Sequence, residues 1–315
     1  PPHAAAAMHN RQTGEPQPVL TVPGEYFEDL VTTPRGDVYS QGGISGDVYR
    51  IRPDGRVDVV TTIPYGCGDN SGYLCGNLGM AVGREGDIWI NEVTYVPGTH
   101  GVWRVRRDGA AWLEIPLPIE EMLAPNGLTF DRHGNLYIAE TVSGVIWKAG
   151  RGEQVATPWL ASPLLTPPPG GFFGANGIEY RRGALYVVNT DRGTIIKVPI
   201  KKDGSPGQPR VFVSGLNGPD NLSLDRFGDL YVVTAYGAQV IRILGREEVE
   251  ILVDSGLTYP SSVDFGRPHG PHLNAFVNDY FPEYGAPNIY QIHLCARPGH
   301  RACRGPMALA ARPCR

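Results

Sequence analysis

The sequence predicts an all-β protein: a six-bladed β-propeller with four strands in each blade. One phrase recurs six times, with an opening residue, apolar residues two and four positions later, a glycine about eight positions on, and then an apolar–aromatic–apolar run. The copies begin 41 to 50 residues apart, the length of a four-stranded blade. The 41 glycines and 29 prolines separate short segments rich in β-branched and aromatic residues, which is typical of many strands joined by turns.

Each copy is interpreted as an alternating strand, a turn centred on glycine, and a second strand containing an aromatic residue. The phrase is clearest in "NGLTFDRHGNLYI" from Asn126 and "DNLSLDRFGDLYV" from Asp220. Two more strands joined by polar turns follow each copy, as in "DVYRIRPDGRVDVVTTI". The six opening residues are Glu28, Leu78, Asn126, Asn176, Asp220 and Ser261.

The ends of the chain complete this prediction. Residues 1–17 have no packing pattern and are expected to form a loose leader. The segment "PVLTV" (Pro18–Val22) is predicted to supply the outer strand of the last blade and so to close the ring. The propeller is expected to span residues 18–294, followed by a tail over 295–315 without a strand pattern.

Composition excludes several kinds of partner. The net charge is −4 and charged residues make up 19% of the chain, so no basic patch for nucleic acid is indicated. There is no apolar run of about 18 residues that would span a membrane. The beginning of the chain shows no intact signal peptide.

The five cysteines leave two interpretations open. Cys67–Cys75 and Cys295–Cys303 share a spacing of eight, which permits two disulfides with Cys314 left free. Neither pair has the spacing of a zinc site, and no His pair accompanies them. Disulfides predict a secreted or periplasmic protein, whereas fully reduced thiols are compatible with a cytoplasmic one.

The opening residues are predicted to form a metal site. In a propeller the innermost strands all start around one end of the central channel, and four of the six openings carry carboxylate or amide oxygens: Glu28, Asn126, Asn176 and Asp220. Such a set, completed by water, is what Ca²⁺ takes, while zinc or copper would require His or Cys. The alternative interpretation is that the Asn-Gly pairs are ordinary turn sequences.

The same residues resemble a known family. "FEDL", "NGLTFD", "ANGI" and "PDNLSLD" are similar to motifs of the calcium-dependent lactonase propellers, a superfamily that includes senescence marker protein/gluconolactonase, luciferin-regenerating enzyme and the paraoxonases. The resemblance covers Glu28 to about Asn278. It implies that a catalytic calcium is bound by Glu28, Asn126, Asn176 and Asp220, with Asn221.

Two positions depart from the family. Paraoxonases place a His near the second-blade opening, where this chain has Leu78 beside Asn77. Gluconolactonases have an Arg where this chain has Ala124. Asp29 matches a ligand of the second, structural calcium of paraoxonases, but Gly127 stands where another Asp ligand would be, so a second ion is not predicted.

The resemblance implies hydrolysis of a lactone or carboxylic ester. Ca²⁺ would stabilise the developing oxyanion, and Asp220 is the predicted base as well as a ligand. Asn77, Leu78, Tyr236 and Glu140 are predicted to contact the substrate. Glu92, Glu140, Asp191 and Asp279 end second strands at the same mouth, and as alternative bases they are interpreted rather as solvated loop charges or turn residues.

Two long loops over the mouth suggest the kind of substrate. "IPYGCGDNSGYLCGN" and "SPLLTPPPGGFFGAN" are rich in Tyr, Phe, Leu and Pro, which favours a hydrophobic small molecule. Two other classes stay open. "LCGNLGMAV" with "GDIWINE" faintly resembles the strictosidine synthase-like propellers, which catalyse a metal-free condensation. A propeller that only binds, with a structural ion, is the third class.

Overall fold

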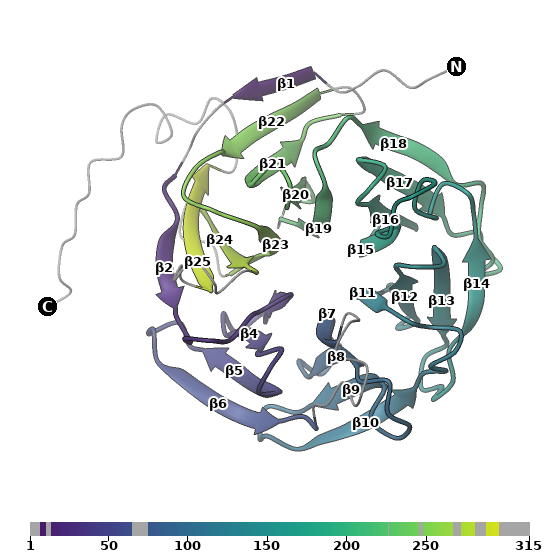
Figure 1. Ribbon diagram of the computed structural model, residues 1–315, viewed down its shortest axis with the longest axis horizontal. Helices are drawn as coiled ribbons and strands as arrows, with labels where there is room; N and C mark the ends of the chain where they lie inside the picture. The colour runs from purple at the N-terminus through teal and green to yellow at the C-terminus, as the bar shows by residue number, and fades with distance from the viewer. Residues whose placement is uncertain are drawn as a thin grey trace, which may run out of the picture.

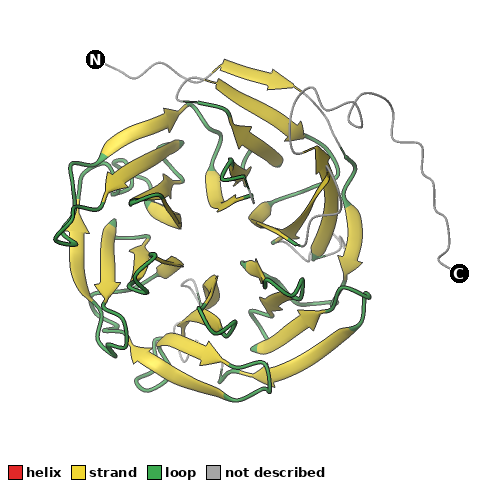
Figure 2. Ribbon diagram, turned by 180° about the vertical axis from the view of Figure 1, so that it is seen from behind, coloured by secondary structure: helices red, strands yellow, loops and turns green. Residues whose placement is uncertain are grey.

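The computed structural model describes residues 7–10, 14–64, 75–225, 227–245, 248–266, 272–280 and 288–295. These residues form six small antiparallel sheets arranged as a ring around a central opening (Figure 1). Strands and loops account for all of the described chain (Figure 2). Within it, no helix is long and apolar enough to cross a bilayer. The prediction of an all-β, six-bladed propeller with four strands per blade is confirmed.

The strands follow the chain outward from the axis within each blade. The innermost strands are β3 (Leu30–Thr32), β7 (Gly76–Val82), β11 (Pro125–Phe130), β15 (Ala175–Arg181), β19 (Pro219–Leu224) and β23 (Pro260–Phe265). The second strands are β4 (Val38–Gln41), β8 (Ile88–Val93), β12 (Leu136–Glu140), β16 (Ala184–Asn189), β20 (Leu230–Thr234) and β24 (His272–Asp279). The third strands are β5 (Asp47–Ile51), β9 (Gly101–Val105), β13 (Val145–Ala149), β17 (Thr194–Pro199), β21 (Gln239–Ile243) and β25 (Ile289–Cys295). The outer strands are β6 (Val57–Thr62), β10 (Ala111–Pro116), β14 (Thr157–Ala161), β18 (Arg210–Ser214), β22 (Glu248–Val253) and β2 (Gln17–Leu20).

The ring is closed by its N-terminal segment. Strand β2 pairs antiparallel with β25 and becomes the outer strand of the sixth blade. The Asn288 side chain secures this junction: its Oδ1 accepts a hydrogen bond from the Val22 N–H (2.7 Å), and its Nδ2 donates to the Glu25 carbonyl (2.9 Å). Closure by this segment is therefore confirmed, with the strand at Gln17–Leu20.

The stretch predicted as a loose leader contains a further strand. β1 (Ala7–Asn10) runs parallel to β22 and lies outside the fifth blade (Figure 1). The outermost strand of a blade leaves unpaired backbone groups along its edge, and a fifth strand satisfies them without any special side-chain pattern. For this reason the leader sequence did not indicate it. Beyond Cys295, the predicted tail lies outside the described residues.

The glycine of the repeated phrase shapes the turn between the first two strands of a blade. Gly134 has φ 88°, a left-handed conformation that a side chain would strain, and Gly228 has φ 80°. Before Gly134, the Asp131 Oδ1 accepts hydrogen bonds from the N–H groups of His133 (2.8 Å) and Asn135 (3.0 Å). This local chemistry explains why Asp and Gly recur at this spacing.

The hydrophobic core lies between neighbouring blades rather than at the axis. Each large cluster draws its buried side chains from two adjacent sheets, as between the second and third blades: Val102, Ile115, Leu128, Ile138 and Trp147. Burial of one such side chain contributes about 1.5–3 kcal/mol. Because apolar packing is satisfied between the sheets, the channel is free to carry polar groups.

Candidate metal centre and active site

The opening residues sit on irregularities at the start of the innermost strands. In the third blade the register with the second strand jumps between Pro125 and Leu128, so Asn126 and Gly127 together face one partner residue. The same jump occurs between Ala175 and Ile178 and between Pro219 and Leu222. A β-bulge of this kind changes the direction of a side chain relative to the regular pleat. Repeated around the ring, it gives the opening residues equivalent positions.

The Asn-Gly pairs are not turns. Gly127 and Gly177 lie inside β11 and β15, and neither has a positive φ angle. A Cβ atom on Gly127 would lie 2.8 Å from the Asn176 carbonyl oxygen, and one on Gly177 would lie 2.5 Å from Asn221 Oδ1. Glycine therefore follows the opening asparagine because the next blade's innermost strand approaches too closely for a side chain. The turn interpretation was wrong.

Asn176 and Asp220 are in direct contact at the ring. Asn176 Nδ2 donates to Asp220 Oδ1 at 2.6 Å and lies 3.1 Å from the Thr190 hydroxyl. Asn126, at the equivalent position of the third blade, is buried, and its carbonyl accepts a hydrogen bond from the Asn91 side chain. The second oxygen of Asp220 has no hydrogen-bond partner among the described residues.

Glu28 and Asp220 place two negative charges in the same environment. The pKa of Glu28 is raised well above its usual value by burial, then by the charges of Asp220 and Asp29. Burial, then the charge of Asp29, raises the pKa of Asp220 to about 8, although the Asn176 hydrogen bond opposes the shift. In the described part of the chain, no Lys, Arg or His forms an ion pair with either carboxylate. The structure therefore leaves the half-buried Glu28 and the buried Asp220 without a cationic partner among the described residues.

This donor set fits a hard cation. Two carboxylates can neutralise a divalent ion, and the amide oxygens of Asn126 and Asn176 can add ligands without adding charge. Over the described ranges, no three His, Cys, Asp or Glu side chains gather as a metal-binding group. Two of the four ring donors are amides, which is the composition expected for calcium rather than for zinc.

Asn221, a predicted ligand, belongs to a layer one residue deeper in the channel. Its Oδ1 accepts the Leu222 N–H (2.8 Å) and its Nδ2 donates to Asp29 Oδ1 (3.0 Å). Asp29 also accepts hydrogen bonds from the Leu30 N–H, the Met80 N–H and the Ser262 hydroxyl. Burial raises the pKa of Asp29 to about 7 despite these donors. Below this layer the channel holds a cavity of about 280 Å³ into which Glu179 and Asp264 also face.

Three of the acids that end second strands hold loops at the mouth. Glu140 accepts hydrogen bonds from Ala124 N–H (3.0 Å), Val142 N–H and the Ser143 N–H and hydroxyl. Asp279 accepts the N–H groups of Thr258 and Tyr259, and Asp191 accepts those of Phe172 and Phe173. Glu140 and Asp279 are only 1% and 2% exposed. Of the two interpretations, that of solvated charges was therefore wrong for them and that of turn residues fits, since backbone N–H groups of the adjoining loops replace the solvent.

Glu92 is different from these three acids. It is fully buried, Gln41 Nε2 donates to its Oε2 at 2.7 Å, and its Oε1 has no hydrogen-bond partner in the described part of the chain. Burial raises its pKa to about 8. Its register partner is Asn77, whose Nδ2 is likewise buried without a partner. Nothing in the sequence indicated Gln41, because it is the tertiary fold that brings the first and second blades together here.

The residues predicted to contact the substrate differ in their exposure to solvent. Tyr236 is 47% exposed, and its hydroxyl donates to Asp191 Oδ1 at 3.1 Å. Asn77 is buried and accepts the Gly79 N–H (2.9 Å), while Leu78 is buried in a small apolar cluster with Val93 and Ala124. The Glu140 carboxylate is occupied by hydrogen bonds from backbone N–H groups of its loop. Ser261 is buried and bonded to the Phe27 carbonyl, as expected for a small ring-lining residue.

Tyrosines follow one another along the rim. Ring centroids are 6.1 Å apart for Tyr236 and Tyr259, 6.2 Å for Tyr259 and Tyr280, and 5.1 Å for Tyr280 and Tyr26. Burial, then the charge of Asp220, raises the pKa of Tyr259, so this tyrosine row lies beside the acidic ring. Phe172, from the Pro-rich loop, is 44% exposed.

The loop between the two predicted cysteine partners lies mostly outside the described residues. Residues 65–74, including Cys67, belong to that undescribed part. Cys75 is described and is buried. The pairing Cys67–Cys75 stays a prediction, as does Cys295–Cys303.

Comparison with known proteins identifies solved structures that share this fold. No protein-family model matches the sequence, and no curated protein sequence matches it. Solved structures that match include a gluconolactonase from Xanthomonas campestris, with a TM-score of 0.68 at 15% identity over 93% of this chain and 99% of that one. The calcium-binding protein regucalcin from Agrobacterium tumefaciens matches with a TM-score of 0.66 at 15% identity, over 93% and 97%. The predicted resemblance to the gluconolactonase-like six-bladed propellers is confirmed at the level of the fold.

The fold alone does not determine the reaction. Virginiamycin B lyase from Staphylococcus aureus also matches, with a TM-score of 0.58 at 18% identity over 85% of this chain and 80% of that one. Because one propeller architecture carries different chemistries, the function has to be argued from the site.

Proposed function

We propose that this protein is a calcium-dependent hydrolase of lactones or carboxylic esters. The observation that supports this most directly is the pair of carboxylates of the half-buried Glu28 and the buried Asp220. They lie beside amide donors at one end of the channel and have no cationic partner among the described residues. The gluconolactonase and regucalcin neighbours, which share the fold, support a lactonase-like activity and a calcium ion. Glu28, Asn126, Asn176 and Asp220 would hold the ion.

When bound, calcium would supply electrostatic stabilisation of the negative charge that develops on the substrate carbonyl oxygen. The protein's own groups have separate tasks. Asn176 fixes the Asp220 carboxylate through one oxygen, which leaves the other free to accept a proton from the attacking water. The water oxygen then bonds to the carbonyl carbon, the C–O bond to the alcohol portion breaks, and that oxygen takes up the proton. A base with a pKa near the working pH is effective in this role.

Glu92 is a second candidate for proton transfer. Its carboxyl group is shielded from solvent, and Oε1 is available. The neighbouring Asn91 bonds to the backbone of Asn126, which connects this buried acid to the ring. Burial keeps Glu92 protonated near neutral pH, so it would first donate a proton, as a general acid, rather than accept one.

The tyrosine row and Phe172 support a hydrophobic substrate. Tyr236 and Phe172 expose aromatic surface beside the ring, and aromatic faces bind apolar or flat groups well. The predicted contact from Glu140 is less favoured, because its carboxylate is buried and bonded to loop N–H groups. Asn77 is buried with its Oδ1 bonded to the Gly79 N–H, and only its Nδ2 is left to donate to a substrate.

The test is hydrolysis of a panel of lactones and aryl esters, graded in size and hydrophobicity, with and without a chelator. Chelation is expected to abolish hydrolysis and calcium to restore it. Glu28→Gln and Asp220→Asn are expected to weaken calcium binding, whereas Glu179→Gln, a matched channel acid outside the ring, is expected to leave it unchanged. Undiminished hydrolysis by a folded Asp220→Asn variant would reject Asp220 as the base.

Other outcomes of the same panel identify the alternative classes. Amine–aldehyde condensation that persists in the presence of chelator would indicate a strictosidine synthase-like enzyme. A chelator that only lowers the melting temperature would indicate a binding propeller with a structural ion.

We also propose that the protein is exported, to the periplasm or outside the cell. The spacing of Cys67 and Cys75 supports this, because a disulfide between them would persist mainly in an oxidising compartment. Mass spectrometry of unreduced peptides is expected to find Cys67 joined to Cys75. Recovery of Cys67 as a free thiol would contradict that pairing.

A further inference from the structure

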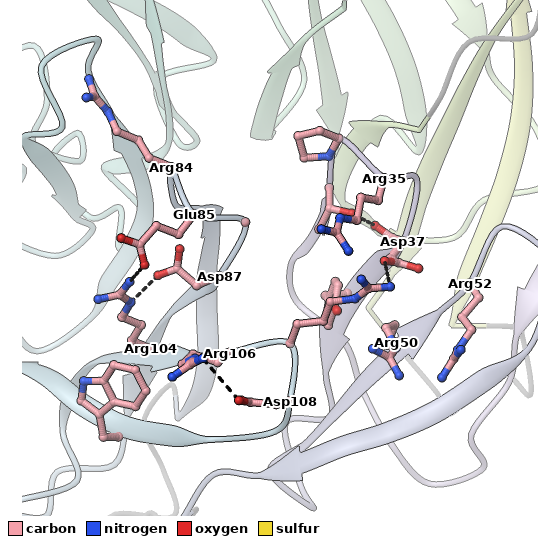
Figure 3. A pocket seen from close by; sticks show the side chains of 16 residues that line it. Arg35, Asp37, Arg50, Arg52, Arg84, Glu85, Asp87, Arg104, Arg106 and Asp108 are labelled. Carbon is pink, nitrogen blue, oxygen red and sulfur yellow. Dashed lines mark hydrogen bonds and ion pairs between the residues drawn. The ribbon is translucent and has the colours of Figure 1, made fainter.

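A large cavity lined by described residues lies on the face opposite the candidate site. The ring residues stand where the innermost strands begin, whereas this cavity is lined by the turns that follow β3 and β7, together with the ends of β5 and β9. It spans the first and second blades and has a volume of about 980 Å³ (Figure 3). We call it the arginine groove.

The arginine groove carries a net positive charge. Its lining includes seven arginines and four carboxylates, and Asp58 and Glu114, which are not part of the lining, pair with three of these arginines, so positive charges exceed negative ones by one. The protein as a whole has a net charge of −4, so this concentration of arginine is local. Such a pocket attracts anions.

Part of this charge is already committed to the protein. Arg104 pairs with Asp87 and Glu85 and lies 5.4 Å from the ring centroids of both Trp89 and Trp112. These contacts make Arg104 a rigid wall of the groove, as Figure 3 shows for its two carboxylate partners.

Arg50 and Arg52 form the second wall. Both pair with Asp58, at 3.1 and 2.6 Å. The Nε of Arg50 is nevertheless buried and has no hydrogen-bond partner in the described part of the chain. A buried donor left unpaired is costly, and a bound acceptor would satisfy it.

The remaining guanidinium groups are weakly held. Arg35 is exposed and forms no ion pair or hydrogen bond with the other described residues. Arg106 pairs with Asp108 at 3.4 Å, with both side chains 59% exposed, and Arg107 reaches Asp37 only at 3.8 Å. Exposed or loosely spaced pairs of this kind contribute little to stability, so a ligand can replace them at little cost.

We propose that the arginine groove binds a small molecule bearing two or more phosphate groups. Guanidinium groups match phosphate oxygens in geometry and form paired, charge-assisted hydrogen bonds with them. A chain of two or three phosphates offers more acceptor oxygens than a single phosphate to the weakly held Arg35, Arg106 and Arg107 and to the unpaired Nε of Arg50.

Titration calorimetry with inorganic tripolyphosphate tests the proposal. Calcium-free buffer is needed because tripolyphosphate itself binds calcium, and about 0.15 M salt screens diffuse attraction. Saturable one-to-one binding is expected, with orthophosphate weaker by at least tenfold. Absence of saturable tripolyphosphate binding would overturn the proposal.

Matched variants locate the binding site. The double variant Arg35→Ala/Arg107→Ala is expected to weaken tripolyphosphate binding at least tenfold while keeping its melting temperature. Arg210→Ala removes an exposed arginine from β18, in the fourth blade, and is expected to change affinity less than twofold. Equal losses in the two proteins would mean diffuse attraction to a basic surface and would reject the groove.

A nucleoside triphosphate as a second probe identifies the source of the phosphates. Tighter binding than tripolyphosphate indicates a nucleotide, and equal binding indicates that the phosphate chain alone is recognised. Lactone hydrolysis in the double variant is expected to be unchanged, since the groove and the ring lie at opposite ends of the channel. The proposal therefore fails or stands independently of the proposed hydrolase activity.

Discussion

Replacement of Gly177 by alanine tests whether close strand packing sets the geometry of the ring. A Cβ at this position would lie 2.5 Å from Asn221 Oδ1, 2.6 Å from Asn221 Cα and 2.8 Å from the Asp220 carbonyl oxygen. Ordinary contacts begin at 3.4 Å. Two of the three atoms belong to the backbone and cannot rotate away. The innermost strand of the fifth blade must therefore move by roughly 1 Å, an overpacking that typically costs about 1–3 kcal/mol.

The displaced strand carries Asp220. Its 2.6 Å hydrogen bond with Asn176 spans the two strands that the new methyl group would push apart. Loss of about 1.4 kcal/mol of binding free energy is a tenfold loss of affinity. Gly177→Ala is therefore expected to lower calcium affinity at least tenfold and to lower the melting temperature by several degrees.

Gly245→Ala is the control, because a Cβ there meets no atom within 4 Å. Both variants are measured by calorimetric titration with calcium and by thermal unfolding in chelator. If Gly177→Ala matches Gly245→Ala in both measurements, the inference from strand packing to ring geometry is refuted.

Three further predictions follow from the buried acids. The pKa values of Asp220 and of Glu179 are both raised to about 8, so the native state binds more protons than the unfolded state between about pH 4 and 8. The melting temperature of the calcium-free protein is therefore expected to fall as pH rises through this window. A rise would contradict the reasoning. Glu92→Gln keeps a neutral side chain at all pH values, so it is expected to raise the melting temperature at pH 9 and to leave it nearly unchanged at pH 5. Glu140→Ala leaves the loop N–H groups without their acceptor and is expected to cost about 2–3 kcal/mol in urea unfolding, whereas the exposed Glu120→Ala is expected to stay within about 0.5 kcal/mol.

The sequence was sufficient to predict the fold and the ring of opening residues. The reason is that both depend on local rules repeated six times, such as the left-handed turn at Gly134 and the strand that follows it. Equivalence in the repeat placed Asn176 and Asp220 at matching positions, and the structure brings them into contact.

The roles of the other acids could not be predicted in the same way. Glu28 and Glu140 are chemically alike in the sequence, yet one lacks a hydrogen-bond partner among the described residues and the other accepts backbone N–H groups from a loop. Asn221 likewise adjoins Asp220 but bonds downward to Asp29. These differences arise from how loops and neighbouring strands fold back, which residue identity does not reveal.

The junction at Asn288 has a consequence for biosynthesis. It joins Val22 to a residue 266 positions later, so the ring cannot be locked until Asn288 has left the ribosome. Strand β2 stays unpaired until β25 of the sixth blade has been synthesised, and long-range closure of this kind is slow. A molecule that misses this step presents the free edge of β25, and the strand best suited to fill it is the N-terminal strand of another copy.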